Sequence, residues 1–303
     1  MKILVTGASG TIGTRLCETL LQSGHEVLGV DIKKNEWQPS IDALTTVADV
    51  TKENALKDID PTGIEAVVHL AAYARVHDLV LNPDRALDNM SMLFRTLEWA
   101  RKNNVPRFVF ASSRECYGNI KVEKYTEDQV RVENCESPYT ASKIAGEALV
   151  ESYRRCYGMK TTIIRFSNVY GMYDLSDRVV PLFFRTARAN EPITVFGDKK
   201  FLDFTYIDDA VQGVKLILEK PEVAAGQTFN LAFSQGTKLL TLAEVMIELI
   251  GSKSTISVTQ PRVGEIFHYV ADITKAKTLL GYDPQTSFDE GIRKSVEWYT
   301  KHT

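Results

Sequence analysis

The segment Thr6 to Gly13, TGASGTIG, restricts the fold more than any other feature of this 303-residue sequence. It lies directly after the apolar stretch Ile3 to Val5 and opens an amphipathic segment. Glycines at this spacing let the backbone turn sharply and approach a pyrophosphate without a Cβ, and the amides that start the helix face the phosphate charge. We therefore expect a dinucleotide-binding loop, in which the contact residues are Gly7, Gly10, Thr11, Ile12 and Gly13. An ordinary strand-to-helix turn is the alternative interpretation, and the residues that follow argue against it.

Two acidic positions after the next apolar stretches extend this prediction. Asp31 ends the stretch that starts at Glu26 and follows Gly13 by 18 residues. A carboxylate there accepts hydrogen bonds from both ribose hydroxyls and repels a 2′-phosphate, so the sequence favours NAD over NADP. The neighbouring Lys33 and Lys34 weaken this preference slightly. Asp49 and Val50 fall where the adenine edge would lie, although Asp49 would serve equally as a helix N-cap.

The periodicity of the first half predicts a Rossmann-type, doubly wound α/β fold. Short apolar runs alternate with amphipathic segments, and the runs are apolar on both faces, which is typical of buried parallel strands. The predicted strands are Ile3 to Val5, Glu26 to Val30, Thr45 to Val47, Ala66 to Leu70, Phe108 to Ala111 and Thr161 to Phe166, with helices over residues 12–23, 84–103 and 138–157.

The second half has a different character, and it predicts a smaller α+β domain for the substrate. Gly and Pro interrupt short segments there, and helical spacing recurs over residues 208–219, 241–250, 274–280 and 288–301. We expect residues 1–167 to bind the cofactor and residues 168–303 mainly to bind the substrate. Residues from about 207 to 233 are a candidate return segment to the first domain.

A tyrosine and a lysine four residues apart form the candidate catalytic pair. Tyr139 and Lys143 share one face of the helix that starts at Pro138. A nearby ammonium and a positive nicotinamide favour the phenolate, which makes the pair a usable proton acceptor. Ser113 ends a predicted strand at the same sheet edge, where its hydroxyl is placed to relay a proton, or simply to cap the strand. A second match to this spacing, Tyr117 with Lys121, crosses a turn and does not predict a shared face.

Composition excludes several other classes of function. The formal net charge is −3 and the basic residues are scattered, which gives no electrostatic case for a nucleic-acid or membrane partner. The four cysteines form no CxxC pair, so we expect neither a metal site nor a disulfide framework. No apolar stretch approaches the roughly 20 residues needed to cross a bilayer, and the expected location is the cytoplasm.

Along nearly its whole length the sequence resembles the extended short-chain dehydrogenase/reductase family, specifically its nucleotide-sugar epimerases and dehydratases. Each matching segment is modest alone, but their order and spacing together are highly specific. The segments are Thr6 to Gly13, His69 to Ala72, Asn89, Ser112 to Gly118, Tyr139 to Lys143, Arg165 to Gly171, Phe204 to Asp209 and Pro261 to Glu265.

The resemblance implies a role for each matching position. Tyr139 would be the base, Lys143 would hold the nicotinamide ribose, and Ser113 would be the hydroxyl partner. Asn168 would bind the sugar diphosphate, Phe196 would lie near the nucleotide base, and Arg262 would contact the phosphates, which its planar guanidinium suits. At the cofactor the resemblance places Leu70, Ala71, Ala72, Asn89 and Phe166.

One departure from the family pattern affects the substrate. Family members usually carry an arginine just before the position of Asp203, whereas this chain has Phe201-Leu202. A neighbouring cation, Arg178, Lys199 or Lys200, is then expected to take its place at the phosphates. Arg178 and Arg75 are also candidates to face a sugar carboxylate.

The reaction itself has more than one candidate. Oxidation of a sugar carbon by NAD, followed by return of the hydride to the other face, gives net epimerisation, and 4-epimerisation of a UDP-hexose is the favoured outcome. Glu115, also a candidate substrate contact, keeps a dehydratase or a UDP-glucuronate decarboxylase open, unless it is a carboxylate at the surface, or behind the residues that touch the substrate, and is paired with Arg114. A non-catalytic dinucleotide sensor is a remote alternative. The resemblance also implies a homodimer built on residues 84–103 and 138–157.

Overall fold

A seven-stranded parallel sheet forms the centre of the molecule. The computed structural model describes residues 1–303. The strands run in the order β10-β6-β5-β4-β1-β2-β3, so the chain winds outwards from β1 in one direction and then from β4 in the other. Ligands of such folds bind where that order reverses. The strands are β1 (Lys2–Thr6), β2 (Glu26–Asp31), β3 (Thr45–Val47), β4 (Ile64–His69), β5 (Arg107–Ser113), β6 (Lys160–Phe166) and β10 (Gln227–Leu231).

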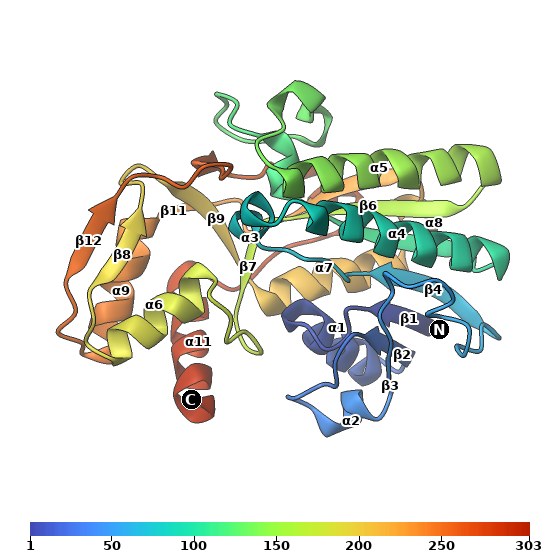
Figure 1. Ribbon diagram of the computed structural model, residues 1–303, viewed down its shortest axis with the longest axis horizontal. Helices are drawn as coiled ribbons and strands as arrows, with labels where there is room; N and C mark the ends of the chain where they lie inside the picture. Colours follow the sequence, from blue (N-terminus) through green and yellow to red (C-terminus); the bar gives the residue numbers. More distant parts are fainter.

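Helices cover both faces of this sheet, because successive strand residues point to opposite sides (Figure 1). Leu4, Val67 and Phe108 belong to a core shared with α4 (Asp84–Lys102) and α5 (Pro138–Tyr157). Ile3, Val68 and Val109, one position away along each strand, belong to a larger core shared with α1 (Thr11–Gln22) and α7 (Ile207–Glu219). Burial of apolar side chains on both faces is what the unbroken apolar runs predict.

One predicted strand is not buried. Thr45–Val47 forms β3, but it lies at the edge of the sheet and pairs only with β2. The Val47 side chain is 52% exposed. A run of only three residues does not distinguish a central strand from an edge strand, because β-branched residues are common in strands at both positions. Short segments α2 (Pro39–Asp42) and α3 (Val76–Leu81) complete this half.

The C-terminal elements gather beside the carboxyl end of the sheet, at the left of Figure 1. Strand β9 (Phe201–Tyr206) pairs with β11 (Gly236–Lys238), β13 (His268–Tyr269) and β7 (Asn168–Tyr170), while β8 (Ile193–Phe196) pairs with β12 (Ile256–Thr259). The helices there are α6 (Val179–Arg188), α9 (Leu239–Ile250) and α11 (Phe288–His302). The short helices α8 (Pro221–Ala224) and α10 (Thr274–Leu280) pack instead against α7 and β10 of the large sheet.

Two later elements return to the large sheet. Strand β10 pairs in parallel with β6, and α7 packs beside α1. Both lie within the segment about 207–233 that the sequence singles out. None of the helices combines the length and the apolar character needed to cross a membrane.

Candidate active site

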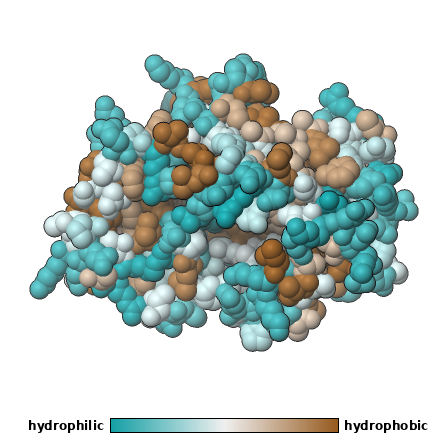
Figure 2. Space-filling model, in the orientation of Figure 1, coloured by the Kyte–Doolittle hydropathy of each residue, from teal (hydrophilic) through white to brown (hydrophobic).

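A cavity of about 550 Å³ opens along the carboxyl ends of the sheet strands. In Figure 2 a recess lies near the middle of the visible face, beneath a band of hydrophilic residues. All but one of the predicted site residues line this cavity. They are Gly7, Gly10, Thr11, Ile12, Gly13, Asp31, Asp49, Val50, Leu70, Ala71, Ala72, Ser113, Glu115, Tyr139, Lys143, Phe166, Asn168, Arg178, Phe196 and Arg262.

Asn89 is the exception, since it does not reach the cavity. Its side chain is buried behind the wall, where Oδ1 accepts a hydrogen bond from the backbone N–H of Tyr73 at 2.8 Å. Its Nδ2 donates to the Tyr73 carbonyl at 3.1 Å and to Ser142 Oγ at 3.2 Å. Asn89 thus fixes the loop that follows β4 and carries several cavity residues.

The glycine loop leaves no space for side chains at two positions. A Cβ on Gly13 would lie 1.9 Å from the Gly7 carbonyl oxygen, and one on Gly7 would lie 2.8 Å from the Ala71 nitrogen. Gly7 also has a φ of +77°, which L-residues rarely adopt. No side chain caps α1, and its first turn carries no acidic residue. The positive end of α1 is therefore open to the cavity, which suits a pyrophosphate.

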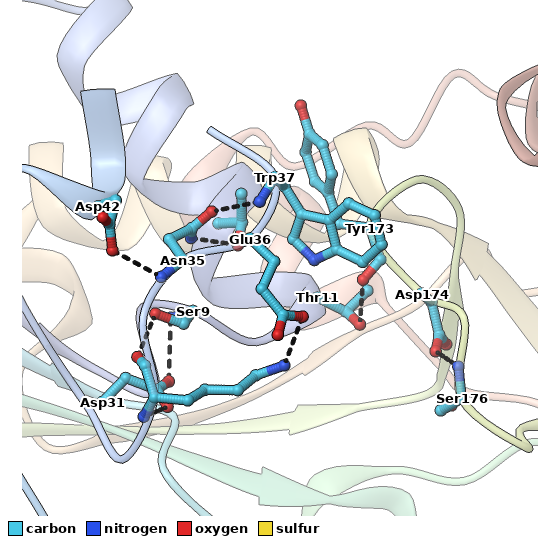
Figure 3. Close-up of polar contacts among 12 residues, drawn as sticks. Ser9, Thr11, Asp31, Asn35, Glu36, Trp37, Asp42, Tyr173, Asp174 and Ser176 are labelled. Atoms are coloured by element: carbon cyan, nitrogen blue, oxygen red, sulfur yellow. Dashed lines mark hydrogen bonds and ion pairs between the residues drawn. The ribbon is translucent and has the colours of Figure 1, made fainter. Parts of the chain in front are cut away.

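Asp31 ends β2 with its carboxylate at the rim of the same loop (Figure 3). Its two oxygens accept hydrogen bonds from the Ser9 N–H at 2.9 Å and the Lys33 N–H at 3.1 Å. A carboxylate has about four acceptor sites, so capacity for two ribose hydroxyls remains. The Lys33 ammonium pairs with Glu36 at 3.2 Å. Asp49 is no helix cap, because it accepts from the Thr51 N–H and hydroxyl in a turn and also lines the cavity.

A strap from the C-terminal half crosses to the glycine loop, which the sequence did not predict. The Thr11 hydroxyl donates to the Tyr173 carbonyl at 3.0 Å, and the Tyr173 ring lies beside Trp37 (Figure 3). The Tyr173 hydroxyl donates to Glu18 and accepts from Gln38, both at 2.9 Å. These contacts join residues far apart in sequence, so no local pattern signals them.

Tyr139, Lys143 and Ser113 meet in the middle of the cavity. Helix α5 carries Tyr139 and Lys143 one turn apart, and both side chains are buried. The Lys143 ammonium donates to the Ala111 carbonyl at 2.7 Å and lies 5.8 Å from the centre of the Tyr139 ring. Ser113 ends β5, and its hydroxyl accepts from the Glu115 N–H at 3.2 Å.

Burial dominates the ionisation of these groups. It raises the pKa of the Tyr139 phenol to about 12, against which the nearby Ser113 hydroxyl acts. The expectation from the sequence included a positive nicotinamide beside the pair; among the protein's own groups, the loss of solvent outweighs the Ser113 hydrogen bond and the charge of Arg178. Burial also lowers the pKa of the Lys143 ammonium to about 8.

The second tyrosine-lysine match does not form a pair. Gly118 has a φ of +67° and turns the chain, and Lys121 is exposed. The Tyr117 hydroxyl instead donates to Asn230 at 2.6 Å and accepts from Arg165 at 3.0 Å. Arg165 also pairs with Glu147 on α5 at 2.7 Å, which fixes the helix of the catalytic pair against β6.

His69 sits below the glycine loop and has a structural environment. It is fully buried at the end of β4, and its Nδ1 lies 2.8 Å from the Thr6 hydroxyl. Burial, with a smaller effect of Lys143, lowers its pKa to about 3. The structure contains no group of three or more His, Cys, Asp or Glu side chains arranged to hold a metal ion.

At the far end of the cavity, Arg262 stacks on Phe196 with its guanidinium carbon 4.0 Å from the ring centre. Arg262 makes no ion pair, so its donors are available to a ligand. The Asn168 side chain donates to the Asp203 carbonyl at 3.0 Å, which leaves its carbonyl oxygen free. Arg178 is the N-cap residue of α6, and its Nη1 lies 3.9 Å from Asp174 Oδ2.

The position of the missing arginine is apolar. Leu202 lines the cavity without a charge, and the three candidate substitutes differ in position. Arg178 and Lys200 line the cavity, whereas Lys199 is exposed and does not. Lys200 is buried in an ion pair with Glu265. Of the two that line the cavity, Arg178 has the longer carboxylate contact.

Arg114 and Glu115 form a buried ion pair at this end of the cavity. Arg114 Nη2 lies 2.8 Å from Glu115 Oε1, and both residues follow Ser113 in a 3₁₀ turn (Arg114–Tyr117). The pairing that the sequence allowed is present, and it is not at the surface, because both side chains are at most 10% exposed. Burial raises the pKa of Glu115, and the Arg114 guanidinium opposes this.

Comparison with known proteins identifies relatives across the whole chain. The model of the NAD dependent epimerase/dehydratase family matches residues 3–232. A UDP-glucose epimerase of Bacillus subtilis, itself uncharacterized, is 34% identical over 312 residues, covering 98% of each chain. The UDP-glucuronate 4-epimerase of Thermodesulfobacterium geofontis is 33% identical, covering 97% of this chain and 95% of the relative. The solved UDP-glucose 4-epimerase of Thermotoga maritima, with UDP-glucose, is 31% identical with a TM-score of 0.91, covering 100% and 99%.

Proposed function

The chain belongs to the NAD dependent epimerase/dehydratase family, and we propose that it epimerises a nucleotide sugar at C4, with a UDP-hexose as substrate. It is an NAD-dependent enzyme of the Rossmann type. The relatives at 34% and 33% identity carry names that specify UDP-glucose and UDP-glucuronate epimerases. Their names support the reaction, and the lining of the cavity supports one site for NAD and another for the nucleotide sugar.

One observation carries the proposal. The buried group of Tyr139, Lys143 and Ser113 lies between a loop shaped for a pyrophosphate and an unpaired arginine stacked on an aromatic ring. A dinucleotide on one side and a nucleotide sugar on the other would therefore meet at one proton-transfer centre. A plain dinucleotide sensor needs no such centre, and both Tyr139 and Lys143 are present.

The first half of the cavity fits NAD. The α1 N-terminus and Gly7 would hold the pyrophosphate, Asp31 the adenosine ribose, and Asp49 with Val50 would border the adenine. Lys143 would hold the nicotinamide ribose. When bound, NAD supplies the oxidant for the sugar carbon and a positively charged ring near Tyr139.

Tyr139 is the proposed acid and base of the reaction. Its phenol takes the proton of the reacting sugar hydroxyl and later returns it, while Ser113 holds the same oxygen by a hydrogen bond. Burial of Tyr139 opposes the phenolate, so the Lys143 ammonium and the charge brought by the cofactor are needed to favour it.

The second half of the cavity is the proposed substrate site. Arg262 and Arg178 would bind the diphosphate, Asn168 would hydrogen-bond it, and Phe196 would face the base. We propose residues 1–167 as the cofactor domain, with the return segment 207–233, and 168–303 mainly as the substrate domain. The pairing of β10 with β6 supports the return segment.

A second candidate reaction rests on Glu115. It is a buried carboxylate beside Ser113, where it is placed to act in dehydration of the sugar or in decarboxylation of a glucuronate. Its pairing with Arg114 at 2.8 Å opposes both roles, because the carboxylate is already engaged. We therefore place epimerisation first.

We also propose a homodimer formed by α4 and α5. Three large apolar side chains on these helices are exposed, namely Leu87 at 70%, Phe94 at 48% and Tyr157 at 56%. Helix pairs with exposed apolar faces are a common route to a two-fold interface. Sedimentation of the purified protein would give the mass of a dimer, and a monomer at micromolar concentration would contradict this part.

The reaction is tested by incubating the protein with NAD and, separately, UDP-glucose, UDP-N-acetylglucosamine and UDP-glucuronate. Proton NMR and mass spectrometry follow the products. A new anomeric signal at unchanged mass identifies epimerisation and the preferred sugar. Loss of 18 or 44 mass units would instead establish dehydration or decarboxylation. Absence of any turnover with all three would contradict a UDP-sugar substrate.

A further inference from the structure

The ion pair of Arg114 with Glu115 receives no hydrogen bond from a third group. The Glu115 carboxylate has Arg114 as its only ion-pair partner and makes no side-chain hydrogen bond, and its Oε2 is buried without a partner. Arg114 Nη1 is also buried without a partner. The nearest further cation, Lys200, is already paired with Glu265. Arg114 alone therefore restrains Glu115.

Glu115 lies close to the reacting group. Its backbone N–H donates to the Ser113 hydroxyl at 3.2 Å, and its charge acts on the Tyr139 phenol. All three side chains line the same cavity. A carboxylate that shares this cavity with Ser113 and Tyr139 is a candidate general base towards a sugar bound there.

A free carboxylate in this cavity would open a side reaction during epimerisation, the loss of water from the sugar. While the sugar carbon is a ketone, the C–H bond on the neighbouring carbon is acidic. A free carboxylate would remove that proton, the electron pair would form a C=C bond with the next carbon, and the hydroxyl there would leave as water with the proton from the carboxyl group. Return of the stored hydride to the far carbon of the C=C bond, and of a proton to its neighbour, would restore the oxidised cofactor. Relative to the starting sugar, the product would then be 18 mass units lighter with no net change in redox state.

We propose that Arg114 determines the outcome of the reaction by holding Glu115 in the ion pair, so that the ketone is returned as an alcohol and no water is lost. This inference rests on the proposed 4-epimerisation. Arg114 is a positioning residue, since it acts through Glu115. Its guanidinium also packs 5.7 Å from the centre of the Tyr269 ring, which limits its freedom to swing away.

Solvent isotope exchange tests the proposal on the unaltered protein. UDP-glucose is turned over with NAD in D₂O, and the recovered sugars are examined by mass spectrometry and NMR for deuterium on the carbons that flank C4. The proposal expects none after many turnovers, because no base reaches those protons. Deuterium at C3 or C5 in both epimers would overturn it.

Substitution of Arg114 releases Glu115 from the ion pair and should produce the exchange and water loss that the unaltered protein lacks. Arg114→Met should incorporate deuterium beside C4 and divert at least a tenth of the turnovers to a product 18 mass units lighter. Arg114→Lys, which keeps the charge, should behave like the unaltered protein, and Arg114→Met with Glu115→Gln should lose both new signals. A folded Arg114→Met protein that epimerises without exchange or water loss would contradict the proposal.

Two controls keep the outcomes separate. Circular dichroism and thermal melting report whether Arg114→Met folds. If it does not, Arg114→Gln removes the charge but keeps hydrogen-bond donors, and the same signals are expected at a smaller share. If the unaltered protein turns over no UDP-sugar, the proposed function fails. If it epimerises and Arg114 variants show neither signal, only this inference fails.

Discussion

The two halves of the cavity are built in different ways. The cofactor half depends on the backbone of one continuous segment, Thr6 to Gly13, together with strand ends of a single sheet. The sugar half is assembled from side chains on β5, α6, β8 and the loop at Pro261 to Glu265, which meet only in the folded state. Backbone shape is sensitive to one methyl group, whereas a set of separate side chains tolerates exchange of its members.

The difference also shows in the charges. The cofactor half has an uncapped helix N-terminus and two carboxylates, Asp31 and Asp49, that accept hydrogen bonds from backbone amides. The sugar half contains two buried ion pairs, Arg114 with Glu115 and Lys200 with Glu265. Buried pairs are costly to form and seldom stabilise a fold, so their presence in a ligand site is better explained by specificity.

Between the halves, Tyr139→Phe should have the largest effect. Loss of the proton acceptor should lower kcat about a thousandfold while NAD binding is retained. Single-turnover kinetics with UDP-glucose measures the chemical step. Tyr117→Phe is the matched control, because Tyr117 has the same spacing to a lysine; it should cost about 1–3 kcal/mol of stability and keep kcat. Equal loss of kcat in both variants would sink the assignment of Tyr139.

In the cofactor half, Gly13→Ala should weaken NAD binding about a hundredfold, or about 3 kcal/mol. The added Cβ would lie 1.9 Å from the Gly7 carbonyl, so the loop must move. Calorimetric titration with NAD measures the effect. Gly24→Ala is the control: its Cβ meets nothing within 4 Å, and with a φ of +77° it should cost only about 1 kcal/mol of stability. Equal NAD affinity in both variants would show that the loop does not hold the pyrophosphate.

His69 should make the cofactor half sensitive to acid. Its pKa is about 3 in the folded protein against 6.5 for the free group, so the unfolded chain binds the extra proton between these values. Stability is therefore lost as pH falls below 6.5, by about 2 kcal/mol at pH 5. Denaturant unfolding at pH 6.5 and at pH 5 measures this change in the free energy of unfolding. His69→Gln should flatten this slope, while His302→Gln, at an exposed position, should not. An unchanged slope in His69→Gln would disprove the prediction.

In the sugar half, Arg262→Met should have the smallest of these effects. Loss of one charge-assisted hydrogen bond to the diphosphate should raise KM for the UDP-sugar about tenfold with little change in kcat. Lys199→Met removes the same charge from an exposed position outside the cavity and should leave KM unchanged. A large fall in kcat for Arg262→Met would mean that Arg262 acts at the reacting carbon.

The difference between local patterns and contacts of distant segments also explains which features could be predicted from the sequence. The sheet strands and the helices of the first half are periodic and local, and the structure contains each of them at nearly the predicted bounds. The strap at Tyr173, the burial of Arg114 and the edge position of β3 depend on contacts between distant segments. Asn89 matched a family position, but only the fold shows that it supports Tyr73 and does not line the cavity.

The most direct test of the central claim follows the hydrogen on the sugar carbon itself. UDP-glucose that carries deuterium at C4 is converted with NAD in ordinary water, and the position of the label is read by NMR and mass spectrometry. Oxidation and return at one carbon predict an epimer that keeps its deuterium at C4. Conversion with loss of the label to water, or with the label at another carbon, would contradict 4-epimerisation by this cavity.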